Sequence, residues 1–176
     1  MKTHLFLIAN LLLASAAAHA ADGQPISSRP DTAMDSAGAF ARLKTLAGEW
    51  RADTGVSKAK VTYESIAGGT SVVEREELGK MPVMITVYHM DGDRLMLEHY
   101  CAAGNQPRME ARSFSPETGE LRFRFLDATN LRGKDAAHMH NATFHLVDND
   151  HFTAAWELYE GGHSKSVENF EYSRVK

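Results

Sequence analysis

The chain has 176 residues, a formal net charge of -4 at pH 7 and a single cysteine. This length is enough for one domain with a substantial buried core. Lys and Arg are scattered through an acidic chain, which excludes a basic surface for the phosphates of a nucleic acid. Cys101 has no second cysteine to pair with, so the fold must be stabilised by its core rather than by an internal disulfide.

Residues 1–20 have the pattern of a signal peptide. Lys2 gives a basic start, residues 5–13 form an apolar run, and residues 18–20 match an A-x-A cleavage site. The run is shorter than the roughly 20 residues of a membrane-spanning helix, so no membrane span is expected. We expect cleavage near Ala20, a mature charge of -5 after loss of Lys2 from the -4 of the whole chain, and a periplasmic or secreted protein.

The mature chain is expected to begin with a flexible segment, residues 21–35, which is rich in Ala, Ser, Pro and Asp and has no periodicity. One domain, residues 36–176, follows it. Asp35 or Ser36 can cap a short helix, and Gly48 is placed as its C-cap. The helix has apolar residues at helical spacing: Phe40, Leu43 and Leu46. A single amphipathic helix followed only by strands is expected to cover one end of a barrel.

Turn residues recur every eight to twelve positions from residue 49 onward, which is typical of an all-β sandwich or barrel. About ten strands are predicted, at 49–53, 59–65, 70–78, 83–90, 94–101, 108–114, 120–127, 137–147, 151–159 and 166–175. The short connections favour antiparallel neighbours in an up-and-down order. Closure of this meander would remove exposed sheet edges, so we predict an all-β, antiparallel up-and-down β-barrel with a short N-terminal helix capping one end.

The clearest hairpin lies within residues 81–109. Val83, Ile85 and Val87 recur with period two before a break at residues 91–93, and an extended pattern resumes at Arg94. Gly92 can adopt the positive φ that a tight turn requires.

Alternation in the later strands assigns an inward face. Apolar residues share one parity within 120–127 and within 151–159: Leu121, Phe123, Phe125, Phe152, Ala154, Trp156 and Leu158. Such alternation indicates a sheet with one buried and one solvated face. A barrel of about ten strands has room for a small ligand, so a cavity is expected.

The segment Gly48-Glu49-Trp50, after a short helix and at the start of the first strand, resembles the G-x-W of calycin-like barrels. More closely, residues 46–50, 68–70 and 86–93 are similar to the exported DUF1579, nitrobindin-like and lipocalin-like group. The resemblance covers most of residues 40–175. It implies a barrel that binds a small hydrophobic molecule, with haem bound through a histidine on a late strand as one form. His151 and His163 are the best matches for that histidine.

Three histidines are predicted to share the cavity. His99 has the parity of Leu95 and Leu97, and His138 and His140 have that of Phe144 and Leu146. His138 and His140 are two apart on a strand, hence about 6.6 Å apart along it. With His99 they could form a three-nitrogen site with an open position, as in catalytic zinc, and Cys101 would add a soft ligand. The alternative is a polar lining satisfied by hydrogen bonds and water.

Further ligand-binding candidates lie at the predicted barrel mouth. Asn105 and Arg108, in the segment 104–108, offer amide and guanidinium donors, although the same segment also reads as a simple turn. Tyr100 and Trp156 complete the candidates. Glu98 and Glu157 are expected to point outward, unless a bulge inverts their strand.

The sequence has no nucleophile elbow, phosphate-binding loop or catalytic Cys/His pair, which favours binding over catalysis. Three hypotheses follow. The first is an exported carrier or sensor of a small apolar or amphipathic molecule, without a cofactor. The second is a metal- or haem-binding barrel with activity at His99, His138 and His140. The third is an interaction module whose core is filled.

Overall fold

A computed structural model describes residues 34–54 and 57–176, which all fall within one compact unit. The predicted signal peptide and residues 21–33 of the predicted flexible segment lie outside the described residues. Within the described part of the chain, no helix has both the length and the apolar character needed to cross a bilayer.

The helix α1 (Ser36–Lys44) begins where the sequence predicts. The Asp35 carboxylate accepts a hydrogen bond of 2.8 Å from the backbone N–H of Gly38, which confirms Asp35 as the N-cap. The prediction of Gly48 as C-cap is wrong. The helix ends at Lys44 in a tightened turn, in which the N–H groups of Thr45 and Leu46 bond to the carbonyls three residues earlier. Gly48, at φ 128°, opens the first strand.

The N-cap gives a direct test. Asp35→Ala removes the acceptor for one otherwise unpaired N–H group of the first turn, and such losses cost about 1 kcal/mol. We expect urea denaturation to show this decrease, with an unchanged circular dichroism spectrum in the native state. Asp35→Asn, which keeps an oxygen acceptor, should retain most of the stability; equal losses in both variants would contradict the capping role.

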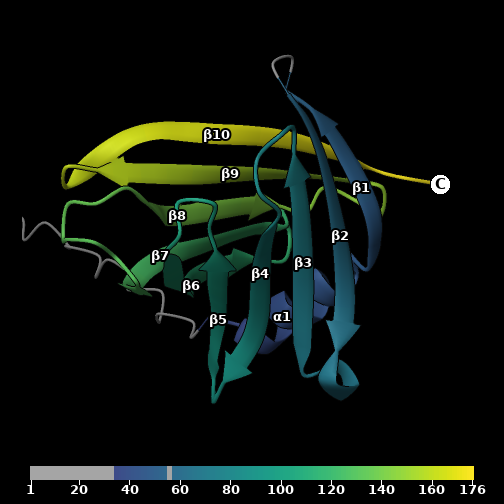
Figure 1. Cartoon of the computed structure of the whole chain (residues 1–176). Coiled ribbons are helices and arrows are strands. Elements are labelled where there is room, and N and C mark those ends of the chain that lie inside the picture. Colours follow the sequence, from purple (N-terminus) through teal and green to yellow (C-terminus); the bar gives the residue numbers. More distant parts are fainter. Residues whose placement is uncertain (1–33, 55–56) are drawn as a thin grey trace, which may run out of the picture. The chain divides into compact units, whose positions relative to one another are not determined.

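Ten strands follow the helix in an all-antiparallel closed barrel of up-and-down order (Figure 1). They are β1 (Gly48–Asp53), β2 (Lys58–Ile66), β3 (Ser71–Leu78), β4 (Met84–Asp91), β5 (Arg94–Tyr100), β6 (Gln106–Ser115), β7 (Glu120–Thr129), β8 (His138–His145), β9 (His151–Glu160) and β10 (His163–Arg174). A 3₁₀ turn, η1 (Ala67–Gly69), joins β2 to β3. Closure through pairing of β1 with β10 confirms the predicted fold class. The predicted tight turn between β4 and β5 is also confirmed, with Gly92 at φ 62°.

The up-and-down order gives the barrel two distinct ends. Odd-numbered strands finish at one end, which we call the open end, and even-numbered strands finish at the other. The helix α1 leads into the start of β1 and contacts β2, β4, β5 and β6, so it covers the second end, called here the closed end. Helix residues Phe40 and Leu43 are buried there, as is Leu46 just beyond it. This confirms that the helix caps one end.

Large aromatic side chains fill the closed half of the lumen. Trp50 packs edge-on against Phe152, with ring centroids 4.8 Å apart, and its indole N–H donates to the Leu46 carbonyl at 2.7 Å. Tyr88, Phe123 and Phe144 form a second set of tilted and edge-to-face contacts. Because these rings occupy this half, space for a ligand must be sought toward the open end.

Candidate functional site

A row of polar side chains crosses the lumen above the aromatic core. Tyr63 on β2 is paired with Glu74 on β3, Glu74 with Thr86 on β4, and Thr86 with His99 on β5. Directly paired residues project to the same face of a sheet, with Cβ atoms about 5 Å apart. The four side chains, called here the polar row, are all buried, so they line the inside of the barrel.

Glu74 is held by tyrosine hydroxyls. Tyr88 donates its hydroxyl to a Glu74 carboxylate oxygen at 2.5 Å, and Tyr63 also hydrogen-bonds this carboxylate. Only 4% of Glu74 is exposed. Burial, reinforced by the nearby charge of Glu76, raises the pKa of Glu74 from 4.5 to about 7, because ionisation in a low-dielectric interior is unfavourable.

Glu76 lies one inward position closer to the open end. It accepts a hydrogen bond of 3.2 Å from the Tyr172 hydroxyl, and it is also buried. Burial raises the pKa of Glu76 to about 6, and the charge of Glu168 on β10 adds to the effect. Three carboxylates therefore lie near one another on the inner side of β3 and β10.

No cation faces these carboxylates in the described part of the chain. The buried polar and charged residues there are Ser36, Glu74, Glu76, Thr86, His99, Asn105 and His138, with no Lys or Arg among them. The ion pairs of the described residues involve neither Glu74 nor Glu76. Buried carboxylates are normally paired with a cation or bound to a ligand, so this lumen could accept a positively charged group.

His99 is the last residue of the polar row, and only one of its two ring nitrogens has a hydrogen-bond partner among the described residues. Its Nδ1 lies 2.9 Å from the Thr86 hydroxyl, and its ring packs at 5.0 Å against Trp156 from β9. Burial lowers the pKa of His99 to about 4, so the imidazole is neutral at pH 7 and has one donor and one acceptor. The Nε2 atom is buried without a hydrogen-bond partner among the described residues, although such groups normally have one.

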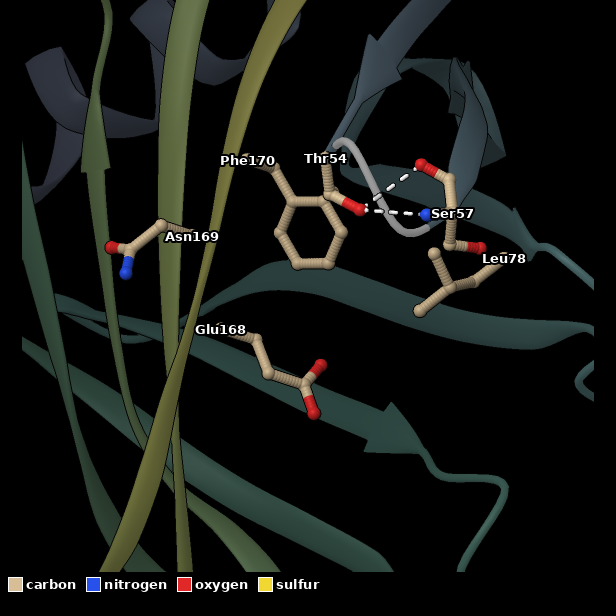
Figure 2. Close-up of a pocket in the computed structure, with 6 residues that line it drawn as sticks. All are labelled: Thr54, Ser57, Leu78, Glu168, Asn169 and Phe170. Atoms are coloured by element: carbon tan, nitrogen blue, oxygen red, sulfur yellow. Dashed lines mark hydrogen bonds between the residues drawn. The ribbon is translucent and has the colours of Figure 1, made fainter.

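A pocket of about 350 Å³ opens beside β10 at the open end, where β1 and β3 finish. It is lined by Thr54, Ser57, Leu78, Glu168, Asn169 and Phe170. Figure 2 shows Glu168 and Phe170 on the same side of β10, toward Leu78, whereas Asn169 points the other way. The Thr54 hydroxyl is bonded to the backbone of Ser57. The pocket thus combines two apolar side chains with one carboxylate.

The structure distributes the predicted ligand-binding residues over different surroundings. His99 and Trp156 lie together in the lumen. Tyr100 is 46% exposed, and Arg108 lies on the outer surface in a two-point ion pair with Asp127. Asn105 is buried at the open end and donates to the Ala137 carbonyl at 2.8 Å, which ties the β5–β6 loop to the β7–β8 connection. Its Oδ1 atom has no partner.

A β-bulge moves His138 and His140 away from the polar row. Ala142 pairs with Trp156, and Met139 pairs with Leu158, so His140 is an extra residue that shifts the register. As a result Met139 packs against the core and His138 is paired with Tyr159. One inserted residue interrupts the alternation on which the predicted parity of His138, His140 and Phe144 depended, although His138 is buried.

His138 and His140 instead belong to an aromatic cluster with Phe125 and Tyr159. The His140 ring stacks on Tyr159 at 3.8 Å and on Phe125 at 4.7 Å, and His138 Nε2 lies 3.0 Å from His140 Nδ1. His138 Nδ1 bonds to the Ala136 carbonyl. Burial lowers the pKa of His140, and the neighbouring His138 adds to this. The ring nitrogens that face each other are used within the pair.

The histidines do not converge on a site for a metal ion or haem in the described part of the chain. Among the described residues, no group of three or more His, Cys, Asp or Glu side chains is close enough to hold a metal ion, so His99, His138 and His140 are not brought together. His151 and His163, the best matches for a haem histidine, are both exposed; His151 bonds to Asp148 and His163 to the Gly161 carbonyl. Neither residue fits a haem inside the barrel.

The acidic and tyrosine side chains of the lumen were missed by the sequence analysis. Of the regular apolar set, Val83 precedes β4 and is 47% exposed, and Ile85 and Val87 are half-buried on the outer face of β4. The buried set of β4 is Met84, Thr86 and Tyr88. In β3 the buried parity carries Glu74 and Glu76 after Val72. The Val-x-Glu-x-Glu spacing of β3 was the sequence signal for a polar lumen. It was missed because two glutamates with period two are also typical of the solvated face of a strand.

The fold and the site define a closed antiparallel β-barrel with one plugged end and a polar, acidic lumen, compatible with a lipocalin-like, or more broadly calycin-like, architecture. Comparison with models of protein families gives no match, and a search of the curated proteins gives none either.

Proposed function

We propose that this protein is an exported carrier or sensor that binds a small amphipathic molecule in the open half of its barrel. The observation that supports this most directly is the buried Nε2 of His99. It lies in a row of lumen side chains and has no hydrogen-bond partner in the part of the chain that the structure describes. An unpaired buried polar group costs about 1–3 kcal/mol, so a ligand that satisfies it gains affinity. A pocket of about 350 Å³ at the open end is within the size range of small-molecule sites.

Two other hypotheses have less support. A completely filled barrel conflicts with the pocket beside Phe170, although it describes the closed half well. A metal or haem function would need histidines that converge, whereas His99 lies with Thr86 and Trp156 and the other two histidines lie with Tyr159. Native mass spectrometry with metal analysis on untagged protein separates the hypotheses. An organic mass without metal supports the carrier, and one metal or haem per chain supports the second hypothesis.

A substitution at the pocket tests where the ligand binds. Leu78→Trp adds a large ring beside Phe170, and we expect it to weaken binding of the neutral apolar probe N-phenyl-1-naphthylamine at least tenfold, measured by probe fluorescence. Val167→Trp is the matched control. Val167 lies on the same strand, β10, but is 51% exposed and does not line the pocket, whereas Glu168 and Phe170 do. Equal affinities in both variants would place the probe elsewhere and contradict the proposal.

A further inference from the structure

The interior of the open half is negatively charged and has no compensating cation among the described residues. Glu74 and Glu76 are buried, Glu168 is half-buried at the pocket, and Glu168 is close enough to influence the ionisation of Glu76. Tyr88 and Tyr63 donate to Glu74, and Tyr172 donates to Glu76. A hydroxyl relieves part of the desolvation of a carboxylate and neutralises none of its charge.

His99 supplies an independent sign of an absent ligand. It is 3% exposed, and residues 34–54 and 57–176 provide no hydrogen-bond partner for its Nε2 atom. It lies in the same cross-strand row as Glu74, with Thr86 between them. When Nδ1–H donates to Thr86, Nε2 is an acceptor, as the carboxylates are. The carboxylates on β3 and β10 are acceptors, and His99 on β5 adds a third acceptor in the tautomer that has Nδ1–H, so a matching ligand must be rich in N–H or O–H donors.

Apolar side chains lie beside these acceptors, together with the polar Thr54, Ser57 and Asn169 of the pocket. Leu78 and Phe170 line the pocket, Met84 is paired with Glu76, and Trp156 packs on His99. An inorganic cation would leave these side chains without a partner, and a purely apolar molecule would leave the carboxylates unpaired. A fatty acid would place a third or fourth negative charge among them, which like-charge repulsion disfavours.

We infer that the ligand of the lumen is an amphipathic amine, whose protonated nitrogen is bound by Glu76, Glu168 and the polar row and whose apolar part lies against Phe170 and Leu78. This inference rests on the proposed carrier function and specifies its ligand class. An ammonium group offers three donors in a compact volume, which suits several acceptors on different strands.

The test is a set of three probes with the same chain: n-octylamine, 1-octanol and octanoate, each titrated calorimetrically into the full-length mature protein at pH 7.4. We expect octylamine to bind at least tenfold more tightly than octanol, and octanoate to bind more weakly than octanol. Equal affinities for all three would overturn the amine inference and leave the carrier function standing. Absence of binding by all three probes and by N-phenyl-1-naphthylamine would overturn both.

Substitutions then locate the charge. Glu76→Gln and Glu168→Gln should each lower the affinity for octylamine about tenfold and leave that for octanol unchanged. Glu77→Gln is the control, since Glu77 is the next residue on β3, is partly exposed and pairs with Arg75 on the outer face. Because Glu168 is only half-buried, its variant tests the inference even if Glu76→Gln fails to fold. Unchanged octylamine affinity in Glu168→Gln and in a folded Glu76→Gln would overturn the inference.

Discussion

Glu74→Gln should remove a large part of the pH dependence of stability. Because the folded-state pKa of Glu74, about 7, lies above its ordinary value of 4.5, the folded protein favours the protonated form. The stabilising contribution is complete below pH 4.5 and is lost as pH rises through 7. A difference of 2.5 pKa units corresponds to about 3 kcal/mol. We expect the free energy of unfolding of the wild type to fall by this amount relative to Glu74→Gln between pH 4.5 and pH 7.5.

Urea denaturation at several pH values measures this difference without altering ionic strength. His99 acts in the opposite direction, because its lowered pKa adds stability above pH 6.5 that is lost toward pH 4, but it is present in both proteins and cancels. Glutamine keeps the shape and the acceptor for Tyr88. Parallel stability curves for wild type and variant would show that Glu74 does not ionise in a buried environment, and Glu77→Gln should run parallel to the wild type.

Arg174 should be the most important charged residue for stability at the closed end. Its guanidinium donates to three backbone carbonyls, those of Asn149, Ala47 and Thr45, at 2.7, 2.7 and 2.9 Å. It also lies 4.1 Å from the centroid of Trp50. These contacts join the end of β10 to the end of α1 and to the β8–β9 turn. We expect Arg174→Met to lower the free energy of unfolding by about 3 kcal/mol, since hydrogen bonds from a charged group contribute about 1.5–3 kcal/mol each and are not additive.

Two variants distinguish this geometry from a general charge effect. Arg174→Lys keeps the charge, but a lysine ammonium lacks the planar set of donors with which the guanidinium reaches three carbonyls. We therefore expect an intermediate loss in the free energy of unfolding. Arg51, next to Trp50 on β1, is exposed and pairs with the surface carboxylate of Glu49. Arg51→Met should therefore lower the free energy of unfolding by less than about 1 kcal/mol. Equal losses of unfolding free energy in Arg174→Met and Arg51→Met would contradict the role of Arg174 in joining β10 to α1 and to the β8–β9 turn. Chemical denaturation followed by Trp fluorescence reports all three.

The two predictions describe opposite halves of the barrel. At the closed end, Arg174 and the aromatic side chains around Trp50 and Phe152 satisfy one another and stabilise the fold. Toward the open end, Glu74 and Glu76 lower stability near neutral pH because burial disfavours their ionised forms and no ion pair of the described residues involves them. Groups that cost stability in the free protein are expected at a binding site, since the ligand that pairs with them recovers the cost.

The sequence by itself determined the elements and their order. The Asp35 cap, the turn at Gly92 and the strand limits depend on local conformational preferences within a few residues, so they could be predicted closely. Closure into a barrel with a plugged end followed from the number of short antiparallel connections and from the single amphipathic helix. The inward position of His99 and Trp156 followed from clear alternation in β5 and β9.

Only the tertiary structure decided which polar side chains share the lumen. One extra residue at His140 reverses the alternation of β8 and separates two histidines from His99, and nothing in the local sequence marks it. The outer face of β4 carries Ile85 and Val87, whereas Thr86 and Tyr88 point inward. Period two gives two faces without saying which one is buried; that choice is made by pairing with distant strands, which places Glu74 between Tyr63 and Thr86 and so creates the acidic site.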